Sequence, residues 1–151
     1  MVDENKVLLK EIEKYAKENK VPIMQKDGIK FLTNYVQEQG VKSILEVGTA
    51  IGYSAICMAL VDPKIKITTI ERDEERIKEA KINFKNVGVE EKIKLYEGDA
   101  VEILPTLNEK YDMVFIDAAK GKYPFFLKEA LRMINENGII FADNILYKGY
   151  V

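Results

Sequence analysis

The stretch ILEVGTAIGYSAICMA, residues 44–59, contains the turn that decides the fold. Its first part belongs to an apolar segment, KSILEVG at residues 42–48, which is typical of a buried strand. Its last part belongs to YSAICMALV at residues 53–61, which we predict to be a helix. Gly48 and Gly52 lie in the turn between the two. The stretch therefore predicts a strand–turn–helix unit of a parallel α/β sheet.

The same alternation continues along the chain. We predict four further strands, at residues 64–71, 92–98, 111–117 and 138–144, and three helices between them, at 73–88, 100–107 and 123–138. Asp73 and Gly88 are typical of the residues at which a helix begins and ends. Strands joined by helical crossovers form an open parallel sheet with helices on both faces.

Two more helices are predicted ahead of this region. Apolar residues recur at helical spacing between positions 7 and 15, Pro22 interrupts the pattern, and a second helix ends at Gly40. The 151 residues show no repeat and no linker between domains. We predict one domain over 1–151, with N-terminal helices in 1–40 and an α/β core in 41–151.

Composition excludes several classes of chemistry. The formal net charge is −2, so an RNA partner would need a local basic patch. The sequence has no histidine, which excludes a histidine base and histidine ligands to a metal. Cys57 is the only cysteine and lies in an apolar run, where we expect it to pack in the core rather than act as a nucleophile. With no leader and no bilayer-length apolar run, we expect a cytoplasmic protein that does not enter membranes.

Every predicted strand has an acidic residue at or near its carboxyl end. These ends carry Glu46 with Gly48, Glu71, Asp99, Asp117, and Asp143 with Asn144. Ligands of open α/β sheets bind in the crevice beyond the carboxyl ends of the strands. Each acid taken alone is equally well explained as a helix cap, but capping alone is a poor explanation for all five.

The first turn favours a nucleoside ligand without phosphates. Ala50 stands where a dinucleotide-binding turn has its middle glycine, which lets the backbone approach a pyrophosphate. Glu71 ends the second strand of the sheet, where it can accept hydrogen bonds from a ribose diol. S-adenosylmethionine fits this set, because acids near its sulfonium are favourable and acids near a pyrophosphate are not. NAD-type binding is the less favoured alternative.

A second group of oxygen ligands follows the last two strands. Asp117, Asp143 and Asn144 are hard donors that suit Mg²⁺, although Asp143 and Asn144 could equally form a turn. Lys120, three residues after Asp117, could take a proton from a hydroxyl held by the metal if its pKa were lowered. The alternative for Lys120 is a solvated loop lysine, as for the nearby Lys122.

Six segments resemble one enzyme family: YAKENKVPIM, ILEVGTAIGYSAICMA, TIERDEER, YEGDA, VFIDAAKGKY and DNILYKGYV. They resemble the class I S-adenosylmethionine-dependent O-methyltransferases of the cation-dependent, catechol O-methyltransferase-like family. Within it the chain is most similar to bacterial tRNA 5-hydroxyuridine methyltransferases. The resemblance implies a Rossmann-like sheet with strand order 3-2-1-4-5.

The resemblance also implies residue roles. Residues expected to bind the methyl donor are Met24, Glu46, Gly48, Ser54, Glu71, Asp99, Ala100 and Asp117. Residues expected to bind Mg²⁺ are Asp117, Asp143 and Asn144, with Lys120 and Asp117 as the catalytic pair. Met24 could instead be a buried core methionine.

The resemblance leaves open both the extent of the chain and the acceptor. Members of the family usually continue past residue 151 into a final antiparallel strand pair. The fifth strand would then be an exposed apolar edge, so we expect either a truncated chain or a second chain that covers this edge. The expected substrate is 5-hydroxyuridine in tRNA. The alternatives are a small catechol-like phenol, or a donor-binding module without turnover, with a nicotinamide-dependent reductase as a more distant one. Relatives often form homodimers, and we expect one here.

Overall fold

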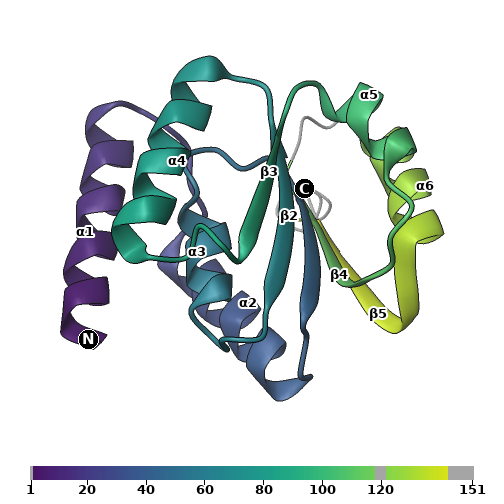
Figure 1. Ribbon diagram of the computed structural model, residues 1–151, viewed down its shortest axis with the longest axis horizontal. Coiled ribbons are helices and arrows are strands. Elements are labelled where there is room, and N and C mark those ends of the chain that lie inside the picture. Colours follow the sequence, from purple (N-terminus) through teal and green to yellow (C-terminus); the bar gives the residue numbers. More distant parts are fainter. Residues whose placement is uncertain (1, 118–121, 143–151) are drawn as a thin grey trace.

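The structure, a computed structural model, describes residues 2–117 and 122–142. In these residues five strands form one sheet in the order β3-β2-β1-β4-β5, and every neighbouring pair is parallel, which confirms the predicted topology (Figure 1). The strands are β1 Ser43–Val47, β2 Lys66–Glu71, β3 Ile93–Glu97, β4 Tyr111–Ile116 and β5 Ile134–Ala142.

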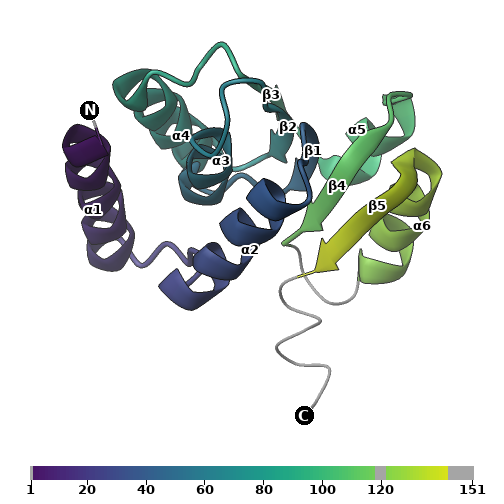
Figure 2. The ribbon, with the colours of Figure 1, turned by 90° about the horizontal axis from the view of Figure 1, so that it is seen from below.

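Helices cover both faces of the sheet. They are α1 Val2–Glu18, α2 Lys26–Glu38, α3 Tyr53–Ala59, α4 Glu74–Val87, α5 Ala100–Ile103 and α6 Tyr123–Met133, with the short 3₁₀ helix η1 Leu104–Thr106 after α5. Figures 1 and 2 show α1 to α4 on one side of the sheet and α5 and α6 on the other. None of the described helices combines the length and the apolar character needed to cross a bilayer.

Strand side chains alternate between two apolar clusters, one on each face. Ile44, Met113 and Phe115 pack with α1 to α4, whereas Leu45, Val114 and Ile116 pack with α5 and α6. Since successive side chains of a strand point to opposite faces, a strand between two helical layers is largely apolar along its whole length. This is why β1 and β4 are mostly apolar in the sequence, and their acidic residues, Glu46 and Asp112, are held by hydrogen bonds.

The predicted ends of α4 are confirmed. The Asp73 carboxylate accepts a hydrogen bond from the backbone N–H of Arg76, 3.0 Å away, and so caps the first turn. Gly88 ends the helix in the left-handed region, at φ 84°. Because α4 begins shortly after β2 ends at Glu71, its capped start lies beside the predicted ligand crevice.

The boundary between α6 and β5 differs from the prediction. We predicted a helix over 123–138 and a strand from 138, but α6 ends at Met133 and β5 begins at Ile134. The pairing of β5 with β4 shifts register between Ile134 and Ile139, and Asn137 has a φ of 70°. The polar residues that resemble a helix end therefore form an irregularity inside the strand.

A single carboxylate ties the beginnings of three strands together. Asp112 accepts hydrogen bonds from the backbone N–H groups of Lys42 and Ser43, at 2.9 and 3.2 Å, and from the Asn135 side chain at 2.9 Å. Burial acts to raise the pKa of Asp112, but these three donors outweigh it and leave the pKa below its ordinary value. This end of the sheet is thus fixed by charge-assisted hydrogen bonds.

Candidate functional site

Two hollows lie at the carboxyl end of the sheet and share two residues, Gly48 and Asp117. The larger has a volume of about 330 Å³ and the smaller about 10 Å³. Predicted donor-binding residues in the larger lining are Gly48, Glu71, Asp99, Ala100 and Asp117. The smaller one is lined by the predicted residues Met24, Gly48, Ser54 and Asp117, together with Thr49, Ala50 and Tyr53. The structure thus brings the described members of the predicted donor set together, apart from Glu46, which lies beneath them.

Gly48 allows the turn after β1 to approach β4 closely. Its φ is 102°, and a β-carbon at this position would lie 2.4 Å from the backbone oxygen of Asp117. The Asp117 N–H in turn donates to the Val47 oxygen at 2.9 Å. Any side chain at position 48 would therefore push apart the two residues that separate the hollows.

Glu71 is held by backbone donors at the end of β2. One carboxylate oxygen accepts from the Ala50 N–H at 2.8 Å, and the other accepts from the N–H groups of Arg72 and Asp73, each at 3.2 Å. The first bond ties the β1–α3 turn to β2. Because a carboxylate offers about four acceptor positions, Glu71 can still accept a hydrogen bond from a ligand in the larger hollow.

Asp99 both caps a helix and lines the larger hollow. Helix capping and ligand binding, the two roles considered for the acids at the strand ends, are therefore compatible at this residue. One oxygen accepts from the Val101 N–H at 2.9 Å at the start of α5, and the other lies 3.3 Å from the Arg72 guanidinium. The adjacent Ala100 contributes a small apolar surface to the same lining.

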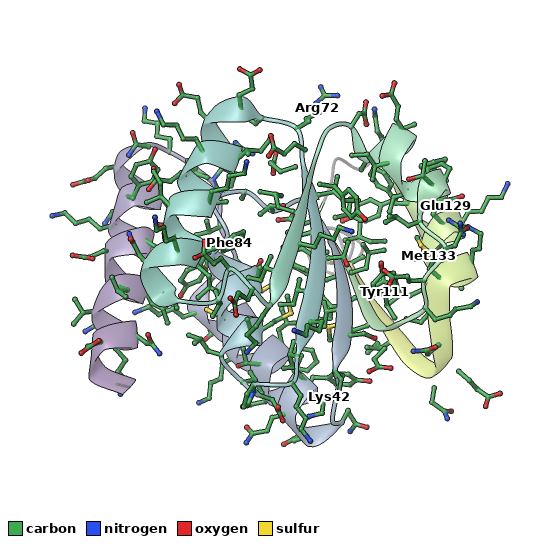
Figure 3. The ribbon with its side chains drawn as sticks, viewed as in Figure 1. Lys42, Arg72, Phe84, Tyr111, Glu129 and Met133 are labelled. Atoms are coloured by element: carbon green, nitrogen blue, oxygen red, sulfur yellow. The ribbon has the colours of Figure 1, made fainter. Side chains whose placement is uncertain are left out.

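The sequence did not single out the basic side chains at the rim. Arg72, Arg76 and Lys122 also line the larger hollow, and two of the three arginines of the chain are among them. Figure 3 shows Arg72 at the end of the molecule opposite Lys42, beyond the carboxyl ends of the strands. The motif TIERDEER contains both arginines, but their spacing alone does not reveal that they face the crevice.

Glu46 lies under the smaller hollow with no exposed surface. Its carboxylate accepts hydrogen bonds from the hydroxyls of Ser54 and Thr69, the latter at 2.7 Å. Burial raises the pKa of Glu46 to about 7. The two hydroxyls counteract part of that rise, while the nearby charges of Asp117 and Glu71 add to it. Thr69 was not identified from the sequence, although two threonines within a buried strand mark an unusual polar position.

Met24 and Tyr53 form the outer wall of the smaller hollow. Met24 is 9% exposed and packs against Gly28, so it is both a core methionine and a lining residue. The Tyr53 hydroxyl donates to the Glu13 carboxylate at 2.5 Å, which connects α1 to α3, and burial raises the pKa of Tyr53. Cys57, one turn further along α3, is buried as predicted, and burial raises the pKa of its thiol to about 12. It is not positioned for nucleophilic chemistry.

The predicted metal and catalytic residues are described in part. Asp117 lies between the two hollows and is half-buried, whereas Lys120, Asp143 and Asn144 lie outside the described residues. Among residues 2–117 and 122–142, no group of three or more acidic or cysteine side chains is arranged to hold a metal ion. The magnesium site therefore stays a prediction, and Asp117 is the one ligand with a known position.

Comparison with known proteins identifies the family of this fold and crevice. The family model described as O-methyltransferase matches residues 1–151, and the chain belongs to this family. A catechol O-methyltransferase of Niastella koreensis is 38% identical over 127 residues, which are 81% of this chain and 58% of that protein. The chain spans between about half and three fifths of the length of the first curated relatives it matches.

Solved structures of O-methyltransferases share the fold. The enzyme TomG of Streptomyces achromogenes, in complex with SAM, has a TM-score of 0.86 and 28% identity, with 94% of this chain and 67% of that chain covered. A Bacillus cereus O-methyltransferase in complex with SAH has a TM-score of 0.83 and 27% identity, with 90% and 65% covered. These likenesses agree with the sequence-based assignment of the family and of the Rossmann-like sheet.

Proposed function

We propose that the protein transfers the methyl group of S-adenosylmethionine to a hydroxyl oxygen of an acceptor. The observation that carries the proposal is the pair of hollows that meet at Gly48 and Asp117. The larger would take the nucleoside. The methionine part would lie against the residues of the smaller, which has room for about one water in this structure, and the sulfonium would then lie close to Asp117. A carboxylate beside a sulfonium cation is favourable.

The lining of the larger hollow suits a nucleoside that carries no phosphate. Ile70, Ala100 and Phe126 supply apolar surface for a base, and Glu71 and Asp99 supply acceptors for hydroxyl and amino groups. Around the smaller hollow, Met24 would pack against the methionine chain and Ser54 would face its polar end, with Glu46 behind Ser54.

The proposed catalytic residues are those that the resemblance to the family implies. Asp117, Asp143 and Asn144 would hold Mg²⁺, which lowers the pKa of a coordinated hydroxyl when it is bound. Lys120 would take the proton of the acceptor hydroxyl. The acceptor oxygen then attacks the methyl carbon as the carbon–sulfur bond breaks, which leaves S-adenosylhomocysteine, and the crevice contributes by holding the reacting atoms in line.

Two acceptors present the required hydroxyl beside a second oxygen. The first is 5-hydroxyuridine in tRNA, for which Arg76 and Lys122, beside the acids of the same lining, are the candidate phosphate contacts. The second is a small catechol-like phenol, which is favoured by relatives named catechol O-methyltransferase.

A single assay compares the two acceptors. Methyl transfer from isotopically labelled S-adenosylmethionine is measured with tRNA containing 5-hydroxyuridine and with a catechol, each with and without EDTA. At saturating S-adenosylmethionine, so that a change in donor affinity does not enter, Arg76→Glu should lower turnover of tRNA but not of catechol, because only tRNA carries phosphates. Lys78→Glu, exposed on the same helix, is the matched control. Equal effects of Arg76→Glu on both acceptors would exclude the RNA contact, and full activity in excess EDTA would exclude the metal.

We also propose that the protein forms a homodimer. Among the described strands β5 is an edge of the sheet, and an edge strand offers unpaired backbone groups. Light scattering after gel filtration measures the assembly directly, and a monomer at all concentrations would contradict the proposal.

A further inference from the structure

Four side chains beneath the smaller hollow form a continuous chain of hydrogen bonds. The Thr69 hydroxyl donates to the Glu46 carboxylate at 2.7 Å, and the hydroxyls of Thr49 and Thr69 lie 2.6 Å apart. Ser54 donates to the other oxygen of Glu46. The exposed fractions of Glu46, Thr49 and Thr69 are 0, 1 and 0%, so water cannot replace a lost partner.

The charge of Glu46 fixes the direction of every bond in this chain. A hydroxyl has one proton to donate. When Glu46 is ionised, Thr69 gives its proton to the carboxylate and must therefore accept one from Thr49. Ser54 gives its proton to Glu46 as well. When Glu46 is protonated, it can donate to Thr69. The direction of the hydrogen bond between Thr69 and Thr49 can then reverse.

Both ends of the chain reach the donor site, whereas its middle does not. Thr49 and Ser54 line the smaller hollow, and Thr69 lines neither hollow. With Glu46 ionised, both hydroxyls give their protons to the interior, so only their oxygen lone pairs remain for a ligand. Such oxygens suit the ammonium of the methionine part, which S-adenosylhomocysteine shares with the methyl donor, rather than its carboxylate.

We propose, on the basis of the function proposed above, that Thr69 is a positioning residue for the methyl donor. Its hydroxyl links Glu46 to Thr49 and keeps the Thr49 oxygen turned as an acceptor toward the smaller hollow. Thr69 acts through Thr49 and Glu46 without touching the ligand. The hydrogen bond between Glu46 and Thr69 follows from the strand register, because Glu46 of β1 is paired with Thr69 of β2.

The groups around Glu46 determine how this linkage depends on pH. Burial raises its pKa to about 7, the Ser54 and Thr69 hydroxyls lower it, and the charges of Asp117 and Glu71 raise it. The charge of Glu46 in turn acts on the buried Cys57 thiol of α3, whose pKa it helps to raise. Removing the Thr69 hydroxyl therefore raises the pKa of Glu46, and less of the ionised form is present near neutral pH.

The test is the affinity for S-adenosylhomocysteine, measured by calorimetry between pH 5.5 and 8.5 in four proteins: wild type, Thr69→Val, Thr69→Ser and Thr68→Val. Wild-type affinity should fall below about pH 7, where Glu46 takes up a proton. Thr69→Val should move that midpoint upward by on the order of one pH unit, which corresponds to the loss of a hydrogen bond to a charged group. At pH 7 its affinity should be roughly fivefold weaker than that of the wild type from this shift alone. The weakening that remains near pH 8.5, where Glu46 is largely ionised in both proteins, measures the loss of the Thr49 orientation.

The controls separate positioning from simple loss of packing. Thr69→Ser keeps the hydroxyl and should restore the wild-type midpoint. Thr68→Val makes the same change at the neighbouring position, whose side chain points to the other face of β2, and should leave the midpoint unchanged. Melting temperatures show whether each variant is folded. If Thr69→Val does not fold, Thr69→Cys, whose thiol is a weak donor, should give an intermediate shift.

The outcomes distinguish the role proposed for Thr69 from the proposed function as a methyltransferase. An unshifted midpoint in folded Thr69→Val or Thr69→Cys, or an equal shift in Thr68→Val, overturns the role of Thr69 and leaves donor binding intact. A wild-type protein that does not bind S-adenosylhomocysteine at any pH overturns both.

Discussion

Replacing Gly48 by alanine tests whether the turn after β1 determines the donor site. A β-carbon at position 48 would lie 2.4 Å from the Asp117 backbone oxygen. Non-bonded carbon and oxygen atoms approach to about 3.3 Å, so the turn and the end of β4 must separate by roughly 1 Å. The displacement falls on Asp117, which lines both hollows.

The matched control is Gly88→Ala. Gly88 also has a positive φ, 84°, but its β-carbon would meet nothing within 4 Å. Both variants place alanine in the left-handed region, which costs about 1–2 kcal/mol. Only Gly48→Ala adds a clash, which brings a further loss of about 1–3 kcal/mol. A displacement of this size among reacting groups slows transfer by on the order of a hundredfold.

Urea unfolding measures the free energy of unfolding of both variants, and calorimetry with S-adenosylhomocysteine measures donor affinity. We expect Gly88→Ala to bind like the wild type. Gly48→Ala should remain folded and bind at least about tenfold more weakly. The reasoning is wrong if Gly48→Ala binds with wild-type affinity and loses no more stability than Gly88→Ala.

Other substitutions test separate parts of the structure. Asp112→Ala should lower the free energy of unfolding by about 1–3 kcal/mol in urea, and the loss should shrink as acid protonates the wild-type carboxylate, whose folded pKa is lowered. An unchanged value would mean that the three strand beginnings do not depend on this residue. Tyr53→Phe removes the bond to Glu13 and should cost about 1 kcal/mol in thermal unfolding. Glu46 has a raised folded pKa, so its contribution to stability is complete below about pH 4.5 and is lost as pH rises through about 7. Glu46→Gln should remove that slope from pH-dependent unfolding curves, and a slope of wild-type size would assign it to other groups. Lys120→Ala should slow single-turnover methyl transfer by on the order of a hundredfold and leave donor affinity unchanged, whereas a wild-type rate would make it a solvated lysine.

The fold could be predicted because its signals are local. A strand between two helical layers is largely apolar, and a helix is favoured by a capping residue, so β1, β4 and the ends of α4 are recognisable from short segments. The start of β5 was predicted incorrectly because INENG has the composition of a helix end. Its position in the sheet depends instead on contacts with Asp112 and Tyr111 of β4, which are distant in sequence.

The site could be predicted to the level of strand ends and no further. That Glu71, Asp99 and Asp117 would lie around one crevice follows from parallel strands ending at one edge. The hydrogen bond between Glu46 and Thr69 can be predicted only when the register of β1 on β2 is known. That Arg76 lines the larger hollow can be predicted only when the direction of α4 is known. Neither is encoded in a short motif.

The central place of β1 has a consequence for how the site moves. It has a strand on each side and an apolar cluster on each face, so its backbone amide protons should be among the slowest in the protein to exchange with deuterium. The turn with Gly48 continues directly from this strand. A pocket anchored to such a slow-exchanging segment is largely formed before its ligand arrives and loses little conformational entropy on capturing it.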